Sequence, residues 1–200
     1  MKDVKMTWDA GKWLNSPVLA QIEGDFLRVT PQKGTDFWKK TYYGFDFEDG
    51  AALLADWQSG SAIEVSFLLS GFNELYDQAG ILLYHGSEQW IKTGIEINDG
   101  VPQISAVVTD GYSDWSCTAI PEWVGEEVTI RASVLNEAVI IRARTQRHPW
   151  RTVRVARFPY PSQNQAGPYA CSPTREGFEV VFTRWEFKKA DEDLHIDPES

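Results

Sequence analysis

Three short segments in the middle of the chain carry polar and aromatic side chains where buried strands usually carry Val or Ile. They are residues 76–80, 90–96 and 113–116, and they contain aromatic, acidic, basic and amide groups. Successive side chains of a β-strand point to opposite faces of its sheet. From residue 90 onward, this alternation places Ile91, Thr93, Ile95 and Ile97 on one face and Trp90, Lys92, Gly94 and Glu96 on the other. The first set is typical of a core, and the second could do chemistry.

Sugar binding is the chemistry that these residue types fit best. It needs an aromatic ring that stacks on the sugar and planar polar groups that bond to its hydroxyls. Trp90 and Trp115 could supply the rings, while Gln78, Lys92 and Glu96 could supply the polar groups. The simpler alternative is a solvated face with an exposed ion pair between Lys92 and Glu96, which would contribute little to stability. The tryptophan on the same face favours function.

We predict that these five side chains line one pocket and that further ligand-binding residues lie around it. The expected edge and rim residues are Asp77, Asp114 and Arg154 at the edges, and Asp36, Trp38 and Tyr43 at the rim. For the rim cluster, an equal alternative is that Phe37, Trp38 and Phe45 pack in the core and in a turn.

Glu96 is the best candidate for a catalytic residue. Lys92 and Arg154 are expected to flank it and to keep it ionised, because opposite charges lower the pKa of a carboxyl group. A glycosidase needs two carboxyl groups about 5 to 9 Å apart across the sugar, yet Gly94 and Lys92 occupy the positions two and four residues before Glu96. Other familiar catalytic motifs are missing from the sequence. Whether the chain is an enzyme stays open, and glycoside hydrolysis is the one class retained.

Metal and polyanion binding are not expected. His85, His148 and His195 do not pair with another His, Cys or acid at a metal-ligand spacing, so we expect no metal site and no cofactor. The net charge of −10 disfavours nucleic acid and membrane partners. Arginines gather between residues 142 and 157, where Arg142 and Arg144 are expected to face outward and Ile141 inward. Most of these arginines are expected to be solvated and to meet acidic neighbours.

The sequence also bears on the cellular compartment. The N-terminal residues contain no apolar signal-peptide core, and no apolar run approaches the length of a membrane span. We therefore expect a cytoplasmic protein. Cys117 and Cys171 are too few for a disulfide framework, so buried reduced thiols are favoured, with a single bridge between them as the alternative.

Short alternating or apolar runs separated by turn signals indicate strands throughout the chain. Turn signals such as those at 48–50 and 98–100 recur at a spacing typical of an antiparallel sandwich or barrel. Residues 159–177 are rich in Pro, Gly, Ser and Asn, and are predicted to form an irregular loop with one short edge strand at 169–171. One domain is expected over 1–190, followed by a tail over 191–200 that is too polar to bury anything.

Taken in order, these segments resemble the regulation-of-enolase protein family. The residues that carry the likeness are Asp36-Phe-Trp38, Tyr43-Gly44, Tyr76-Asp-Gln-Ala-Gly80, Trp90-Ile-Lys92, Gly94-Ile-Glu96, Ser105-x-Val107-Val108-Thr109, Ser113-Asp-Trp-Ser116 and Cys171-Ser-Pro173. Arg154 stands where the family has an arginine before a late loop. The resemblance implies an all-β, concanavalin A-like jelly-roll sandwich of two curved antiparallel sheets, with the polar residues on the concave sheet.

The resemblance does not by itself imply an activity, because this fold carries lectins, glucanases and interaction domains. We expect, first, a protein that binds a carbohydrate or another small polar ligand on its concave sheet. A regulatory protein-interaction module of carbon metabolism, with a protein partner, ranks second. A glycoside hydrolase ranks third, since the chain lacks the E-x-D-x-x-E arrangement of acids on which glucanases of this fold depend.

Overall fold

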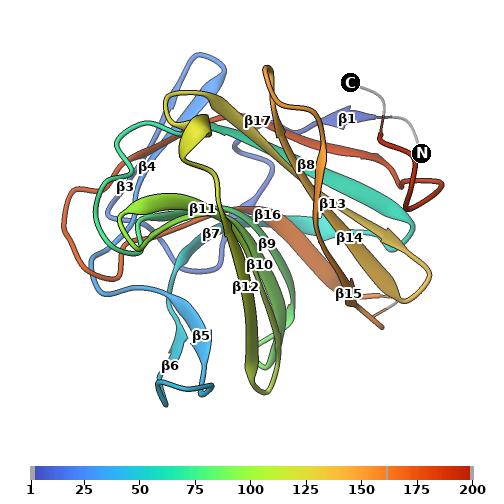
Figure 1. The fold of residues 1–200 in the computed structure, drawn as a ribbon, viewed down its shortest axis with the longest axis horizontal. Coiled ribbons are helices and arrows are strands. Elements are labelled where there is room, and N and C mark those ends of the chain that lie inside the picture. The colour runs from blue at the N-terminus through green and yellow to red at the C-terminus, as the bar shows by residue number, and fades with distance from the viewer. Residues whose placement is uncertain (1–2, 161, 199–200) are drawn as a thin grey trace.

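The computed structural model describes residues 3–160 and 162–198, and the regular structure in them is almost entirely β-strand (Figure 1). Most strands belong to two large sheets that pack against each other. The one helical element among these residues is a 3-10 turn at Pro121–Trp123.

The sheet that carries the candidate site has seven strands. In spatial order they are β12 (Ser113–Ala119), β11 (Val101–Asp110), β10 (Gln89–Asn98), β9 (Gln78–Gly86), β16 (Asn164–Cys171), β7 (Ala51–Trp57) and β2 (Lys12–Trp13).

The opposing sheet has eight strands, and a separate hairpin completes the fold. In spatial order the eight-stranded sheet contains β15 (Arg151–Arg157), β14 (Ala138–Thr145), β13 (Glu127–Leu135), β8 (Ser61–Leu68), β17 (Val180–Lys189), β4 (Phe26–Thr30) and β3 (Leu19–Glu23), with β1 (Val4–Lys5) paired to β17. The hairpin joins β5 (Phe37–Lys39) to β6 (Asp46–Glu48).

The strand order shows how the chain passes between the sheets. Although β16 and β17 follow each other in the chain, β16 lies between β9 and β7 in one sheet, and β17 lies between β8 and β4 in the other. Neighbouring strands run antiparallel in both sheets. This connectivity is typical of a jelly roll, and it confirms the predicted all-β, concanavalin A-like sandwich of two antiparallel sheets.

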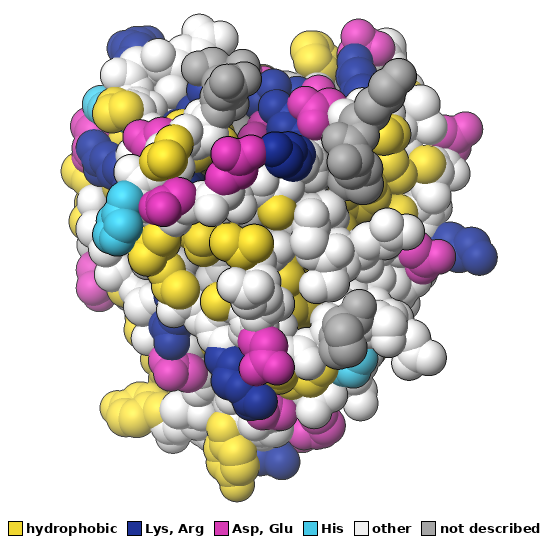
Figure 2. Space-filling view, turned by 90° about the vertical axis from the view of Figure 1, so that its right-hand side faces the viewer, with side chains coloured by type: hydrophobic (Ala, Val, Ile, Leu, Met, Phe, Trp, Pro, Cys, Tyr) yellow, Lys and Arg dark blue, Asp and Glu magenta, His cyan; other side chains and the backbone are white. Residues whose placement is uncertain are grey.

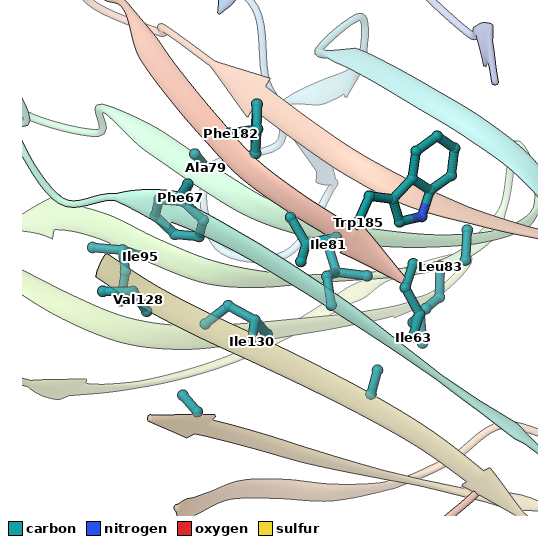
Figure 3. Close-up of a cluster of buried hydrophobic side chains, with 14 of the residues drawn as sticks. Ile63, Phe67, Ala79, Ile81, Leu83, Ile95, Val128, Ile130, Phe182 and Trp185 are labelled. Atoms are coloured by element: carbon teal, nitrogen blue, oxygen red, sulfur yellow. The ribbon is translucent and has the colours of Figure 1, made fainter. Parts of the chain in front are cut away.

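The main core fills the space between the sheets (Figure 3). The figure shows side chains from β8, β9, β10, β13 and β17 that converge there, and the labelled ones are Ile63, Phe67, Ala79, Ile81, Leu83, Ile95, Val128, Ile130, Phe182 and Trp185. Ile91 and Ile95 of β10 belong to this core, so the predicted inward face of that strand is correct. Lys92 and Glu96 consequently point to the outer face.

The prediction of an irregular loop over 159–177 is wrong in its central part. Residues Asn164–Cys171 form the eight-residue strand β16, which lies inside the sheet rather than at its edge. Gly167 is required there, because an added Cβ would lie 1.9 Å from the Leu53 carbonyl oxygen. Pro168 lacks an N–H, and the pairing with β7 is interrupted at this point. The sequence signals for a loop therefore mark a close approach of two backbones.

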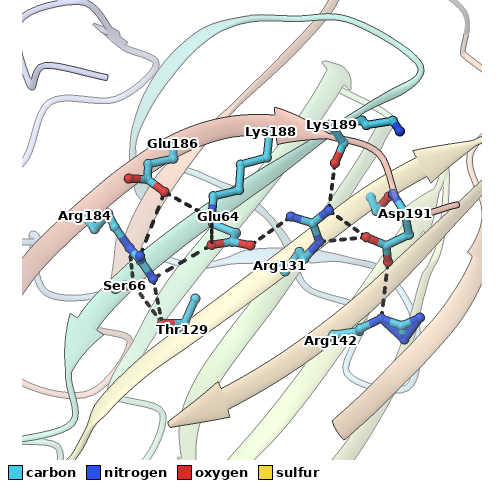
Figure 4. A network of polar contacts seen from close by, with 11 residues as sticks. Glu64, Ser66, Thr129, Arg131, Arg142, Arg184, Glu186, Lys188, Lys189 and Asp191 are labelled. Carbon is cyan, nitrogen blue, oxygen red and sulfur yellow. Dashed lines mark hydrogen bonds and ion pairs between the residues drawn. The ribbon is translucent and has the colours of Figure 1, made fainter. Parts of the chain in front are cut away.

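Arg142 lies on the outer face of its sheet and meets an acidic neighbour, as predicted, but it is not solvated. Its side chain is 1% exposed on the outer face of the eight-stranded sheet, and its Nε lies 3.2 Å from Asp191 Oδ2. Arg131, on the neighbouring strand β13, lies 2.6 Å from Asp191 Oδ1 and 2.8 Å from Glu64 Oε1. Figure 4 shows Arg131 between the two acids, with Arg142 on the far side of Asp191.

The expectation that residues 191–200 bury nothing is also wrong for the residues that the structure describes. Asp191 is buried between two arginines, and its N–H donates to the Ser133 hydroxyl at 2.7 Å. Further along the segment, the Leu194 carbonyl accepts a 2.7 Å hydrogen bond from Arg142. The segment supplies the counter-charge that these buried guanidinium groups need. Figure 2 shows acidic and basic side chains side by side in the upper part of one face, so the surface charge there is mixed.

Cys117 and Cys171 are both free thiols, as predicted, but Cys117 is only half-buried. Cys171 is fully buried in β16. None of the helical structure within residues 3–160 and 162–198 is long and apolar enough to cross a membrane.

Candidate functional site

A pocket of about 290 Å³ opens between the β5–β6 hairpin and the outer face of the seven-stranded sheet. In Figure 1 the hairpin lies apart from both large sheets, below β7. The residues that line the pocket are Gly34, Asp36, Trp38, Tyr43, Phe45, Phe47, Tyr76, Gln78, Lys92, Glu96, Val107, Trp115, Pro173 and Thr174. The structure thus brings together these predicted binding residues: Asp36, Trp38, Tyr43, Gln78, Lys92, Glu96 and Trp115.

Strand pairing places the floor residues in two rows. Glu96 of β10 lies opposite Gln78 of β9. Four residues before Glu96 on the same strand, Lys92 lies opposite Val107 of β11, which in turn lies opposite Trp115 of β12. Each of these side chains points to the same outer face because the pairs are separated by an even number of residues.

A pair of glycines separates the two rows. Gly80 of β9 lies directly opposite Gly94 of β10. A Cβ added at Gly80 would lie 2.1 Å from the Thr93 carbonyl oxygen, and one added at Gly94 would lie 2.1 Å from the Ala79 carbonyl oxygen. The two backbones therefore approach more closely than any other residue type allows. No side chain stands between the rows, and Lys92 and Gln78 can meet across the gap.

Lys92 is the centre of the polar group on the pocket floor. Its side chain is 3% exposed, and its Nζ donates to Asp36 Oδ1 at 2.5 Å and to Gln78 Oε1 at 2.8 Å. Gln78 Nε2 in turn donates to Asp36 Oδ1 at 3.3 Å. Burial opposes the charge on Lys92, but the attraction of Asp36 and other nearby groups outweighs it and raises the pKa of the ammonium group. Lys92 and Asp36 therefore form a buried ion pair held by a shared amide.

Glu96 lies in a different environment from the one predicted. Burial raises the pKa of its carboxyl group, and the opposing effect of Lys92 only partly offsets this. Arg154, the second predicted neighbour, does not line the pocket. The expectation that two cations hold Glu96 firmly ionised is therefore wrong, and the carboxyl group takes up a proton more readily than an ordinary glutamic acid.

Two polar atoms at the pocket floor lack hydrogen-bond partners. Within residues 3–160 and 162–198, nothing bonds to the buried Oε1 of Glu96 or to the buried Nε1 of Trp115. The Ser105 hydroxyl and the Trp115 indole nevertheless lie near enough to the Glu96 carboxyl group to favour its ionised form. Buried polar atoms are usually paired, so these two indicate a place that a ligand or solvent fills.

Aromatic rings from the β5–β6 hairpin form a wall of the pocket. Tyr43 and Phe45 are stacked with ring centroids 5.4 Å apart, and Tyr43 also meets Trp38 edge-on at 5.7 Å. The turn that presents them contains Lys40 and Tyr42 in the left-handed backbone region, at φ 60° and 61°. Non-glycine residues rarely adopt this conformation, and strain of this kind is concentrated at functional sites.

Tyr76 also lines the pocket, although it was not among the predicted binding residues. A hydrogen bond to the Tyr43 side chain, with burial, raises the pKa of its hydroxyl to about 12. Its backbone is also left-handed, at φ 63°. The segments quoted for the family resemblance contain both Tyr76 and Pro173, so the sequence offered a signal for these two lining residues.

Trp90 does not line the pocket. It is fully buried, and Phe37 covers it edge-on with ring centroids 5.6 Å apart. It belongs to a second hydrophobic cluster, on the outer face of the seven-stranded sheet, which also includes Trp38, Leu82 and Tyr169. The alternation of β10 placed Trp90 on the correct face, but the hairpin folds over that part of the face. The predicted packing role is correct for Phe37 and Trp38, which belong to this cluster. Phe45 is half exposed and packs on Tyr43 in the hairpin, and both Trp38 and Phe45 also line the pocket.

Asp77 does not line the pocket, and its carboxylate instead fixes the loop before β9. Its carboxylate is buried, accepts two hydrogen bonds from Arg175 at 2.7 and 2.9 Å, and accepts the N–H groups of Asn73 and Glu74 at 3.0 Å. These contacts fix the turn that precedes β9 and thereby position Tyr76. Arg175 has no sequence signal that links it to this loop.

Asp114 and Arg154 lie outside the pocket and pair with each other. Arg154 Nη2 lies 3.1 Å from Asp114 Oδ1, and Nη1 donates to the Ser116 hydroxyl at 3.0 Å. Asp114 and Trp115 are adjacent on β12, so their side chains must point to opposite faces. Both members of the pair line a separate hollow near β15.

The acids of the pocket do not form a metal site. Throughout the described residues, no three His, Cys, Asp or Glu side chains gather closely enough to hold a metal ion. The pocket instead combines an ion pair, an amide, a carboxyl group of raised pKa and aromatic rings.

Comparison with known proteins places this arrangement in a family. Residues 13–190 match the family model described as "Protein of unknown function (DUF1349)". The chain is 36% identical over 176 residues to "Regulation of enolase protein 1" of Saccharomyces cerevisiae, covering 88% of this chain and 87% of the yeast protein.

Solved structures show the same fold. One of a functionally unknown protein from Saccharomyces cerevisiae superposes with a TM-score of 0.83 at 32% identity, covering 92% of this chain and 98% of that one. A xylan beta-1,4-xylosidase from Bacillus halodurans superposes with a TM-score of 0.69 at 13% identity, covering 92% of this chain and 39% of the enzyme. At that identity the second likeness shows the fold alone. From the family match and the yeast relative, the chain belongs to the regulation-of-enolase family, described as "Protein of unknown function (DUF1349)".

Proposed function

We propose that the protein binds a carbohydrate or another small polar ligand in the pocket beneath the β5–β6 hairpin. The observation that carries this proposal is the pairing of aromatic walls with a buried polar floor. The floor groups Lys92, Asp36 and Gln78 are held in place by their own hydrogen bonds. Small-molecule sites typically combine an apolar lining with a few fixed polar groups.

The pocket suits a ligand of about the size of one or two sugar units. Its volume of about 290 Å³ lies near the lower end of the range for small-molecule pockets. Stacking on rings such as Tyr43 and Trp115, together with a few hydrogen bonds, is expected to give a weak affinity, about micromolar to millimolar.

Glycoside hydrolysis is a second candidate function, because two carboxyl groups share the pocket. Glu96 has a raised pKa, as a general acid requires, and Asp36 contributes to that rise. However, Asp36 accepts hydrogen bonds from Lys92, Gln78 and the Phe37 N–H, which lower its reactivity as a nucleophile or base. Binding without turnover is therefore the preferred function.

A regulatory role through a protein partner is the remaining alternative. The yeast relative bears the name "Regulation of enolase protein 1". On this chain, Tyr42 at the tip of the hairpin is 92% exposed and offers an aromatic contact to a partner. We place the protein in the cytoplasm, since the free thiols Cys117 and Cys171 suit a reducing compartment. The net charge of −10 argues against nucleic acid and membrane partners.

A thermal-shift screen against saccharide and metabolite libraries tests the proposal. Stabilisation of the wild type that Trp115→Ala loses, and that Asp114→Ala keeps, would support binding in the pocket. Asp114 is the matched control because it neighbours Trp115 on β12 and lines a different hollow. Both variants are expected to stay folded, as circular dichroism would verify.

The alternatives give different results in the same screen. Turnover of a bound saccharide by the wild type, lost in Glu96→Gln, would favour the hydrolase. If neither library stabilises the wild type, the binding proposal fails, and a reproducible protein partner lost in Tyr42→Ala would favour the regulatory role.

A further inference from the structure

We propose that the ligand is uncharged and is anchored by one hydroxyl group that bridges Trp115 Nε1 and Glu96 Oε1. This inference rests on the proposed function and names the ligand chemistry that the pocket selects. The two atoms belong to side chains of β12 and β10, on either side of β11, and both side chains line the pocket.

The bridge follows from the two unpaired atoms. Glu96 is 4% exposed, its Oε1 is buried, and within the described parts of the chain neither that oxygen nor the buried Trp115 Nε1 has a hydrogen-bond partner. The indole lies within reach of the Glu96 carboxyl group and favours its ionised form, but its N–H is not aligned in a hydrogen bond with any group of the described residues. A group inserted between them would bond to both and remove two unfavourable burials at once.

A hydroxyl group is the chemistry that fits both atoms. An indole N–H can only donate, whereas an ionised carboxylate oxygen can only accept. One hydroxyl oxygen accepts the first bond and donates the second. An ammonium group would leave Trp115 unpaired, and a ligand carboxylate or phosphate would be repelled by an ionised Glu96.

The charges on the floor favour an uncharged ligand. Lys92 is already neutralised by Asp36 at 2.5 Å, so it offers little attraction to an anion. A cation would meet the ammonium group of Lys92, and an anion would meet Asp36 and Glu96. A polyhydroxylated neutral molecule, such as a sugar unit or a cyclic polyol, avoids both conflicts.

Two tryptophan variants separate the bridge from simple stacking. Trp115→Phe and Trp38→Phe each remove one indole N–H from the pocket and keep an aromatic ring. The Trp38 Nε1 already donates to the Thr41 carbonyl at 2.9 Å, so it has no free hydrogen for a ligand. With D-glucose, D-galactose, D-mannose, D-xylose and myo-inositol as calorimetric probes, Trp115→Phe is expected to weaken binding about tenfold or more, and Trp38→Phe far less.

Monodeoxy analogues of the probe that binds identify the bridging hydroxyl. Removal of one hydroxyl is expected to weaken wild-type binding about tenfold or more, while Trp115→Phe should bind that analogue and the parent sugar almost equally. This non-additivity would show that the hydroxyl and the indole are partners.

The pH dependence of binding gives a second readout. A hydroxyl that donates to Glu96 binds more tightly to the ionised form, so wild-type affinity should rise with pH through the Glu96 pKa, whereas Glu96→Gln should show no such rise. The titratable groups that act on Glu96 are Lys92, Asp36, Tyr76, Tyr169 and Cys117. Lys92 and both tyrosines have raised pKa values and keep one charge state over about pH 5 to 8.

The possible outcomes distinguish the bridge from the proposed function. If no probe or library saccharide binds the wild type, the proposed function fails together with the bridge. If a saccharide binds, but Trp115→Phe and Trp38→Phe weaken it equally and every monodeoxy analogue binds as its parent does, the bridge alone is overturned. Affinity that falls as pH rises would likewise overturn it, because the ligand would then accept from a protonated Glu96.

Discussion

Asp191→Ala is expected to destabilise the protein by removing the shared counter-charge of two buried arginines. The Asp191 carboxylate lies 2.6 Å from Arg131 Nη2 and 3.2 Å from Arg142 Nε. The side chains of both arginines are at most 4% exposed, so water cannot replace the lost partner. Arg131 keeps its contact with Glu64 at 2.8 Å, whereas Arg142 loses its acidic partner.

The size of the effect follows from breaking a buried ion pair on one side. Loss of one partner typically costs about 3–5 kcal/mol, which is a large part of the about 5–15 kcal/mol that stabilises an ordinary domain. For a protein of this length, each kcal/mol shifts the midpoint of thermal unfolding by about 2–4 °C. The expected fall in Tm is therefore about 6–20 °C.

Urea unfolding and thermal unfolding of the purified variant measure this effect. Glu192→Ala is the matched control, because Glu192 is the next residue and its side chain is 75% exposed. We expect no measurable change for the control, and an unchanged dependence on urea concentration would show that both variants unfold as the wild type does. A wild-type midpoint for Asp191→Ala, or equal losses in the two variants, would refute the docking of the C-terminal segment.

Three further predictions concern the pocket. Gly80→Ala should destabilise the fold by about 3 kcal/mol or more in urea unfolding, since the added Cβ would lie 2.1 Å from the Thr93 carbonyl oxygen. Gly86→Ala in the same strand is the control and should be close to neutral, because its Cβ would meet nothing within 4 Å. Lys92→Met should cost about 1–3 kcal/mol and abolish ligand binding, because Asp36 loses its buried partner; wild-type stability would contradict the ion pair. Burial raises the pKa of Glu96 above 4.5, so the folded state holds that proton more tightly than the unfolded state does. The wild type should therefore lose stability relative to Glu96→Gln as pH rises from 4.5 to the folded pKa, and the difference should then level off. A difference in stability that stays constant across this pH range in urea titrations would refute the raised pKa.

Local residue patterns predicted the fold class and the composition of one sheet face. The alternation along β10 follows from backbone geometry alone, so the sequence suffices to assign Ile91 and Ile95 to the core and Lys92 and Glu96 to the outer face. The same rule, applied to β12, separates Trp115 from Asp114, and using it there would have removed Asp114 from the predicted site. The strand β16 was missed because Gly167 and Pro168 usually mark loops.

The sequence by itself determined the all-β architecture and the polar face of β10, because both depend on the period of two along each strand. Only the tertiary structure decided which of those side chains reach the pocket, since that depends on segments far apart in the chain. Asp36 meets Lys92 across 56 residues, and Phe37 covers Trp90 because the β5–β6 hairpin folds over that part of the sheet. In the same way, Asp191 neutralises Arg131 across 60 residues. Contacts of this range depend on how the sheets and loops pack, and no local pattern encodes them.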